Sequence, residues 1–533
     1  MVNEADYVIA GGGSAGCVLA ARLSEDPAVR VTLLEAGPPD ASVLIHCPTG
    51  LGVMARMPTA AFAHNWAFQT VPQPGLNGRR GYQPRGKVLG GSSSVNAMIY
   101  TRGVPEDYDA WAAEGNAGWA WADVLPAFKQ AEHNERGADA FHGTGGPLNV
   151  MDLCDPNPFS HAFVEAGVQA GHAHNPDFNG ASQEGVGLYQ VTHKGGERFS
   201  AAKAYLTPQR ARPNLRVITG ARATRIVIEH GRAVGVAYVQ DGRAHTLRAA
   251  REVVLSAGAL QSPQLLMLSG IGPADHLRAH GIDVVHDLPG VGEHLHDHPD
   301  VVQVWDANRA YELFGLSLPG IARTARAVGQ WRRERRGMLT SNFAEAGGFI
   351  KSDAAESLPD LQLHFVVGKL VNHGRATVFG HGFSCHVCVL RPQSRGSLRL
   401  ASADPLAAPL IDPAFLQDAD DTRRMVAGFR HMREILSQPA LARHGGVERS
   451  AAARTDAEIE AFVRQHADTI YHPVGSCRMG QGPMDVVDAQ LRVRGIDALR
   501  VVDASAMPRI VGANTNAPVI MMAERAAEMM RAL

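Results

Sequence analysis

The chain has 533 residues, of which 45% are hydrophobic and 20% charged, and its formal net charge is −2. This length predicts two or more domains, and the composition is typical of a globular protein with a large core. A nearly neutral chain gives no electrostatic support for nucleic-acid binding, and six cysteines in so long a chain exclude a disulfide framework.

A glycine motif lies near the start of the chain, where Gly11, Gly13 and Gly16 have G-x-G-x-x-G spacing. Gly11 permits a tight turn, Gly13 lets a pyrophosphate approach the backbone, and Gly16 lets a helix pack closely. Glu35 follows Gly16 by nineteen residues (35 − 16), near the spacing of an acid that accepts from ribose hydroxyls. The surrounding pattern predicts a buried strand at 7–10, a helix at 17–23 and a second strand at 31–34. The stretch predicts a dinucleotide site that disfavours NADP and leaves NAD and FAD open.

Residues 70–103 form a second region of small residues and turns. Gly90, Gly91 and Ser92 are too small and polar for a core helix, and they suit backbone that lies against a ligand. A flexible linker is the alternative interpretation. It is less favoured because an apolar run begins directly afterwards, at Val95.

The remaining elements are predicted from periodicity and turn residues. Up to residue 270 we expect helices at 107–113, 122–133 and 158–172, hairpin strands within 214–255, and a strand, turn and helix within 252–270. Beyond residue 300 we expect an amphipathic helix at 321–336, strands at 361–367, 383–391 and 397–400, and helices at 419–437 and 456–466. The last segment returns to a strand at 499–505, followed by a loop and a closing helix within 513–533.

Four separated pieces together resemble one family. They are GGGSAG with Glu35, GKVLGGSSSVNAMIYTRG, AGALQSPQLLMLSGIGP, and YHPVGSCRMG with VVDASAMP and NTNAPVI. This set resembles the glucose–methanol–choline (GMC) family of FAD-dependent oxidoreductases, in particular its bacterial choline and alcohol dehydrogenases. The resemblance runs over essentially the whole chain.

The resemblance implies an α/β fold in which a Rossmann-like FAD-binding domain, built from discontinuous segments, is interrupted by a substrate domain of antiparallel sheet plus helices. The implied FAD-binding segments are 1–155, 214–298 and 466–533, and the implied substrate-domain segments are 156–213 and 299–465. The residues implied to hold FAD are Gly11, Gly13, Ser14, Ala15, Gly16, Glu35, Ala36, Gly91, Ser92, Asn96, Ala97, Ala223, Ala257, Gly258, Asp503, Ala504, Asn514 and Pro518.

One departure from the family pattern concerns the flavin attachment. Some choline-oxidising members carry a histidine that bonds covalently to the flavin, where this chain has Val95. Valine has no nucleophilic atom, so we expect FAD to be bound noncovalently.

His472 and Asn516 match the family's active-site pair. Removing a hydroxyl proton needs a base near neutral pH, and histidine, with an ordinary pKa near 6.5, suits this task. An adjacent amide can donate to the alcohol oxygen. Most of the 24 histidines are expected to be structural, and the motif singles out His472. Asn514 stands two residues before Asn516, so the identity of the second residue stays open.

The expected reaction is oxidation of a primary alcohol to an aldehyde, with hydride transfer to flavin N5 and electrons passing to a quinone, another acceptor or O₂. A choline dehydrogenase is one alternative, and a flavin-containing lyase resembling hydroxynitrile lyases is another. Glu345 is the nearest candidate acid for a choline cation. Because no convincing aromatic cage accompanies it, we favour an uncharged aliphatic or aromatic alcohol.

Two other patterns in the sequence are better explained by structural roles than by metal binding. His294, His296 and His298 alternate as metal ligands can, but the loop resembles the family's NL-x-DHP segment, so no metal is expected. Cys385 and Cys388 lie three apart in a predicted strand and so point to opposite faces, which disfavours zinc.

The expected setting is cytoplasmic. No apolar run is long enough to span a bilayer, and no basic segment followed by an apolar stretch opens the chain. The basic run WRRERRG that ends helix 321–336 is expected to be a solvated helix end. Contact with anionic lipid at this point, and hence a peripheral membrane association, stays open.

Overall fold

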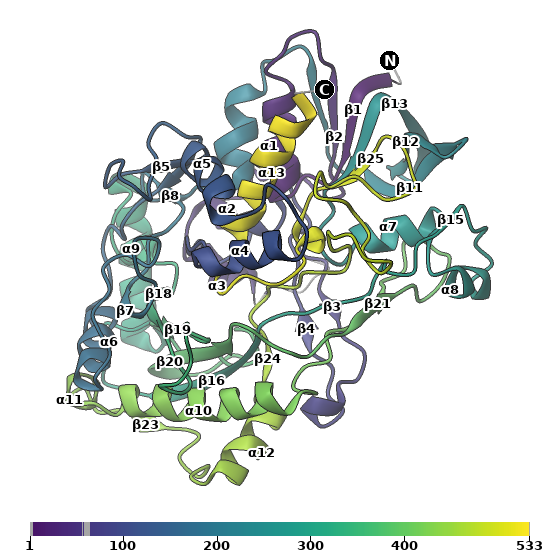
Figure 1. Ribbon diagram of the computed structural model, residues 1–533. Coiled ribbons are helices and arrows are strands. Elements are labelled where there is room, and N and C mark those ends of the chain that lie inside the picture. Colours follow the sequence, from purple (N-terminus) through teal and green to yellow (C-terminus); the bar gives the residue numbers. More distant parts are fainter. Residues whose placement is uncertain (1–3, 56, 58–63, 532–533) are drawn as a thin grey trace.

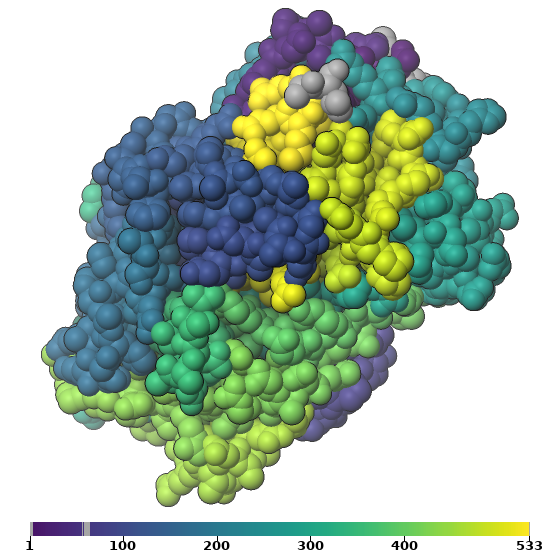
Figure 2. Space-filling view, viewed as in Figure 1, coloured from purple at the N-terminus to yellow at the C-terminus, as the bar shows by residue number. Residues whose placement is uncertain are grey.

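The computed structural model describes residues 4–55, 57 and 64–531. Its elements form two large sheets and several two-stranded ones with helices around them, and the first strand and the last helix lie in the same half of the molecule (Figure 1). Figure 2 shows the same division on the surface: purple N-terminal and yellow C-terminal segments share the upper half, and green segments near residue 400 fill the lower half. The expected α/β fold with an added antiparallel sheet is confirmed.

The first sheet has seven strands, and its core is parallel. β1 (Glu4–Ala10) pairs in parallel with β2 (Val31–Leu34) and with β13 (Arg243–Leu255). β2 and the last four residues of β1 are short apolar runs that are buried, as parallel strands usually are. The remaining members are β10 (Leu215–Ile218), β11 (Arg222–Glu229), β12 (Arg232–Gln240) and β25 (Leu499–Val501).

The glycine motif joins β1 to α1 (Ser14–Leu23), which packs against the last helix, α13 (Asn516–Arg531). Gly11 has φ +111°, and a Cβ at Gly16 would lie 1.9 Å from the carbonyl oxygen of Gly11. Only glycine fits at both positions, so the tight turn and the close packing follow from the sequence.

The second sheet has eight strands and is antiparallel throughout. Its members are β7 (Gly185–Leu188), β16 (Pro299–Asp306), β17 (Gly315–Leu316), β18 (Ala344–Ile350), β19 (Leu361–Val366), β20 (Gly380–Val389), β23 (Val447–Glu448) and β24 (Asp468–Thr469). Helices α6 (Pro158–Gln169) and α10 (Ala419–Leu436) pack on it around an apolar core. In Figure 1, α10 and α12 (Asp456–His466) lie at the lower end of this half.

The expected helices are present, with ends shifted by a few residues: α4 (Pro105–Ala113), α5 (Trp121–Ala131), α6, α9 (Leu318–Glu334), α10 and α12. β24 joins the antiparallel sheet, although the boundary expected at residue 466 assigned it to the cofactor domain. The other domain boundaries stay predictions. Cys385 and Cys388 lie on β20 and pack into two separate apolar clusters, in line with their alternation along a strand. No helix in the described ranges is long and apolar enough to cross a membrane.

Candidate active site

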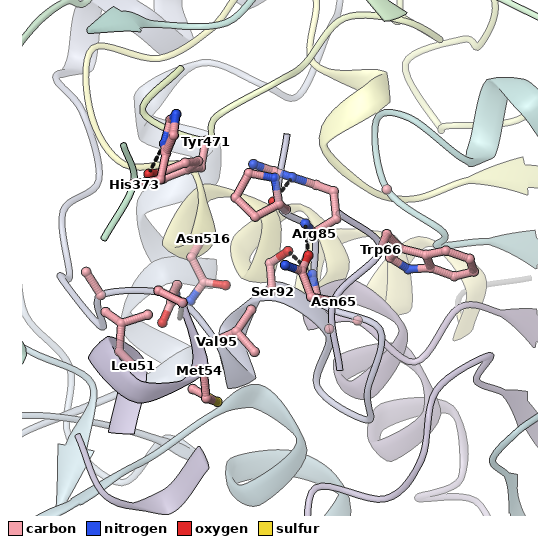
Figure 3. Close-up of a pocket in the computed structure, with 18 of the residues that line it drawn as sticks. Leu51, Met54, Asn65, Trp66, Arg85, Ser92, Val95, His373, Tyr471 and Asn516 are labelled. Atoms are coloured by element: carbon pink, nitrogen blue, oxygen red, sulfur yellow. Dashed lines mark hydrogen bonds between the residues drawn. The ribbon is translucent and has the colours of Figure 1, made fainter. Parts of the chain in front are cut away.

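A cavity of about 660 Å³ lies between the two sheets, at the carboxyl ends of the parallel strands. Ala10 and Leu34, the last residues of β1 and β2, line it, and so does Ser256, which follows β13. Ligands of open parallel sheets bind at this edge. Figure 3 shows part of the lining, with Leu51 and Met54 at one side and Trp66 at the other.

Most of the predicted cofactor residues meet in this cavity. They come from six separate segments of the chain, namely the glycine motif, the end of β2, the loop at Gly91, the start of β11 at Ala223, the turn at Ala257 and the stretch around Asp503 and Asn514. The exceptions are Gly16 and Pro518, which do not line the cavity. Gly16 has the packing role predicted for it, and Pro518 is buried in the first turn of α13.

Glu35 is held at the cavity wall by backbone groups. Its Oε2 accepts from the N–H of Gly12 at 2.9 Å, and its Oε1 accepts from the N–H of Gly37 at 2.7 Å. Burial nevertheless raises the pKa of Glu35 to about 7.

Asp503 joins two of the cavity segments. Its Oδ2 accepts from the N–H of Gly258 at 2.9 Å and from Ser262 Oγ at 2.5 Å, while Oδ1 accepts from the N–H of Ser505 at 2.8 Å. Both oxygens of this carboxylate thus accept hydrogen bonds from groups of the protein itself. It therefore fixes the turn at Gly258 and the stretch at Ala504 relative to each other.

His472 lies in the cavity wall, and a hydrogen bond to His298 decides which of its two ring nitrogens carries the proton. The Nδ1 atoms of the two rings are 3.1 Å apart, and His298 Nε2 lies 3.0 Å from the carbonyl oxygen of Leu390. A carbonyl oxygen only accepts, so His298 Nε2 carries the proton and His298 Nδ1 accepts. His472 therefore donates through Nδ1, which leaves its Nε2 without a proton.

Both rings are neutral. Burial lowers the pKa of His298 to about 3. Burial, reinforced by His298, His364 and Arg85, lowers the pKa of His472 well below its ordinary value of 6.5. The site therefore contains a buried imidazole whose free nitrogen is ready to take a proton.

The loop with alternating histidines positions His472. Asp297 Oδ1 accepts from the backbone N–H of His472 at 2.8 Å, and its Oδ2 accepts from Thr469 Oγ1 at 2.5 Å. His296 Nε2 accepts from the N–H of Ile510 at 3.0 Å. Among the described residues, no group of three or more His, Cys, Asp or Glu side chains is arranged to hold a metal ion.

The amide beside His472 belongs to Asn514, not to Asn516. Asn514 Nδ2 lies 3.3 Å from His472 Nε2, while Oδ1 accepts from Thr101 Oγ1 at 2.9 Å and from Gln362 Nε2 at 3.0 Å. The two donors fix the orientation of the amide and turn its N–H group toward His472. Of the two asparagines that the sequence leaves open, Asn514 is therefore the one beside His472, and the catalytic role of the pair stays a prediction.

Asn516 lies at a different part of the cavity. Its Oδ1 accepts from Ser14 Oγ at 2.7 Å, which connects the first residue of α13 to the first turn of α1. Figure 3 shows Asn516 beside Val95 and Ser92. The sequence alone does not separate the two asparagines, because both belong to the same NTN motif at the start of a helix.

Comparison with known proteins identifies the family. Models of the GMC oxidoreductase family match residues 5–300 and 392–523, which is more than half of the chain. The chain belongs to the GMC oxidoreductase family. Its sequence is 50% identical over 528 residues to the alcohol dehydrogenase [acceptor] of Pseudomonas putida, covering 98% of this chain and 95% of that protein. It is 44% identical over 534 residues to the oxygen-dependent choline dehydrogenase of Brucella ovis, with the same two coverages.

Solved structures agree with this result. Pyridoxine 4-oxidase from Mesorbium loti matches with a TM-score of 0.88 and 34% identity, covering 99% of each chain. Formate oxidase from Aspergillus oryzae RIB40 matches with a TM-score of 0.89 and 26% identity, covering 99% of this chain and 98% of that one. This GMC oxidoreductase is therefore an FAD-dependent enzyme, as the sequence predicted.

The cavity of this GMC oxidoreductase fits FAD. A Cβ at Gly11 would lie 2.4 Å from the carbonyl oxygen of Ser256, so only glycine fits in the turn that lines the cavity at this point. Arg85 is half-buried and lines the cavity, and its buried Nη2 has no hydrogen-bond partner among the described residues. A bound cofactor would satisfy such a group. Val95 also lines the cavity and offers no atom for a covalent link, in agreement with noncovalent FAD.

Two lining residues were missed by the sequence interpretation. The guanidinium of Arg222 lies 5.0 Å from the centre of the Trp66 ring, next to Ala223. An aromatic ring with a stacked arginine is a surface on which a purine can lie. No motif in the sequence points to Trp66, because the strand that brings Arg222 to it starts more than 150 residues later.

Proposed function

We propose that this enzyme oxidises an uncharged primary alcohol to an aldehyde, with His472 as the base that takes the hydroxyl proton. The observation that supports this most strongly is the unprotonated Nε2 of His472, set by His298, at the wall of a largely apolar cavity. FAD, when bound, supplies the hydride acceptor at flavin N5. The electrons leave to a quinone, another acceptor or O₂.

His472 receives the proton directly from the substrate. Because its pKa is lowered, the ring is neutral at physiological pH and Nε2 is free to accept. The hydrogen bond from Nδ1 to His298 keeps the ring in one tautomer and one orientation. A base held in this way is already unprotonated when the alcohol binds.

Asn514 orients the alcohol oxygen. Its Nδ2 and His472 Nε2 are 3.3 Å apart, so one hydroxyl oxygen can donate its proton to the histidine while it accepts from the amide. Thr101 and Gln362 hold the amide in this orientation. The N–H group then stabilises negative charge that develops on the oxygen as the proton leaves.

The lining of the cavity favours an uncharged substrate. Glu345, the candidate acid for a choline cation, is buried outside the lining and accepts from Ser341 Oγ, from Ser160 Oγ at 2.7 Å and from the N–H of Asn157 at 2.6 Å. Many residues that line the cavity are apolar, among them Leu51, Met54, Phe314, Leu316, Leu339, Phe343, Val366, Leu370 and Ile470. No carboxylate in this part of the described wall pairs with a quaternary ammonium, and Phe314, Phe343 and Tyr471 are the aromatic rings that such a cation would meet.

The function is tested by anaerobic mixing of the FAD-loaded enzyme with a panel of alcohols. Bleaching of the flavin absorbance by an uncharged primary alcohol supports the proposal. Bleaching by choline alone would make the protein a choline dehydrogenase, and release of cyanide from a cyanohydrin without bleaching would make it a lyase. Repeating the experiment with O₂ and with a quinone analogue identifies the acceptor.

A further inference from the structure

Exposed apolar side chains surround the point where the cavity meets solvent. Val53 on α3 (Gly50–Met54) and Thr324 on α9 are exposed and both line the cavity, so the cavity opens between these helices. Leu318 is 85% exposed and Phe379 is 78% exposed, and neither lines the cavity. Phe379 forms a β-bridge with Leu316, which does line it. Both exposed side chains therefore stand beside the opening.

The helix at this opening carries apolar residues on its solvent face. Leu318, Ile321, Ala325 and Val328 recur at three- and four-residue spacing along α9, and all four are exposed. The buried side of the same helix packs through Ala327 and Trp331 against Cys47 and Leu339. A surface helix normally turns its apolar stripe toward the core. The second, outward stripe of α9 is covered by none of the described residues.

The same helix is strongly basic. It contains four arginines and one acid, Glu334. The arginines are Arg323, Arg326, Arg332 and Arg333, and in the described part of the chain none of them forms an ion pair with an acidic side chain. The next two arginines differ, because Arg335 pairs with Glu197 and Arg336 pairs with Asp155. The free positive charge is thus concentrated on α9.

We propose that α9 and Phe379 dock the enzyme on an anionic lipid bilayer, with the cavity opening facing the membrane. An apolar stripe flanked by arginines is the pattern of helices that lie in a membrane interface. The occupant has to be both apolar and negatively charged at its surface, and anionic lipid meets both conditions. The proposal rests on the proposed function in one respect: an apolar alcohol dissolved in the bilayer would enter the cavity without crossing water.

Sedimentation with lipid vesicles tests the docking. The FAD-loaded enzyme is mixed with vesicles of phosphatidylcholine containing phosphatidylglycerol and with vesicles of phosphatidylcholine alone. Wild type is expected to sediment with the anionic vesicles and to be released by high salt. The double variant Arg326→Gln/Arg333→Gln should bind about 25-fold more weakly, roughly fivefold for each arginine. The double variant Leu318→Asp/Ile321→Asp should lose about tenfold or more.

A matched control uses Val285, which is 49% exposed and lies next to β15 (His286–Asp287), on the opposite side of the view from α9 in Figure 1. Val285→Asp should bind vesicles as wild type does. All variants should oxidise a water-soluble alcohol at the wild-type rate, which shows that they fold. Vesicle binding and the oxidation rate are measured separately, so failure of the docking proposal is distinguishable from failure of the proposed function.

Three results would overturn the proposal. The first is equal binding of wild type to neutral and anionic vesicles. The second is unchanged vesicle binding by Leu318→Asp/Ile321→Asp. The third is a fall in the molar mass of this variant in solution without loss of vesicle binding, which would make the face a contact between copies of the chain.

Discussion

His298 and His472 are 174 residues apart in the sequence, and their Nδ1 atoms are 3.1 Å apart in the structure. The carbonyl oxygen of Leu390 accepts from the other nitrogen of His298, so the direction of the hydrogen bond between the rings is fixed. This relationship leaves Nε2 of His472 free to accept a proton. It assigns a positioning role to a histidine for which the sequence predicted no catalytic role.

Replacing His298 tests this role. In His298→Leu nothing accepts from His472 Nδ1, so the ring loses its fixed tautomer and turnover should fall by about 10²-fold. His298→Gln can still accept from His472 and donate to Leu390, and it should recover most of the rate. The steady-state kcat and the FAD content of both variants are measured to check this. Equal losses in both variants would mean that His298 is merely a core residue.

The two asparagines should behave differently. Asn514→Ala removes the donor to the alcohol oxygen and should lower kcat/KM by about 10²-fold or more, with FAD retained. Asn516→Ala breaks the bond to Ser14 and should weaken FAD retention while the fully loaded enzyme keeps its turnover. Flavin content and kinetics of both variants decide between them. The opposite pattern would return Asn516 to the role first predicted for it.

The flavin should leave the protein on denaturation, because Val95 provides no nucleophile. After precipitation with acid, the yellow colour is expected in the supernatant and not on the polypeptide. Absorbance spectra of the two fractions check this. Colour retained by the washed precipitate would show a covalent link made through another residue.

A buried charge cluster outside the active site should make stability fall at alkaline pH. His142 lies between Glu132 and Asp177, and despite burial these carboxylates raise its pKa to about 9. A raised folded-state pKa contributes stability that is complete below the unfolded value near 6.5 and is lost as the pH rises through 9. The contribution is at most about 3 kcal/mol.

Thermal unfolding of wild type and His142→Gln between pH 6 and pH 10 measures this contribution. The difference in Tm between the two proteins should shrink as the pH rises. A constant difference over this range would show that the histidine does not lose a proton there.

Much of the fold follows from local pattern, and the reasons are physical. Gly11 and Gly16 occupy positions where a Cβ would collide with backbone, so the glycine motif in the sequence predicts the tight turn and the close helix packing. The central parallel strands β1 and β2 contain short buried apolar runs, at residues 7–10 and 31–34, with turn residues after them. Such features are encoded within short stretches of sequence.

The site was predictable only in part, because its details depend on contacts between distant segments. His472 follows from its motif, whereas the pairing with His298 requires two loops to meet. Asn514 and Asn516 differ only in whether the residue precedes or begins α13, and this decides which side chain reaches His472. Glu345 lies on a strand buried on both faces, and its carboxylate accepts hydrogen bonds from Ser160 and Ser341. The sequence gives no sign of these hydrogen bonds.

The rate of flavin reduction by an alcohol in His472→Ala tests the central claim most directly. The variant is loaded with FAD, its flavin content is verified, and it is mixed anaerobically with the best alcohol of the panel. We predict full FAD content and a rate of bleaching about 10²–10⁴-fold below wild type, because the proton of the alcohol then has no acceptor. Bleaching at the wild-type rate, or loss of flavin in parallel with activity, would contradict the assignment of His472 as the base.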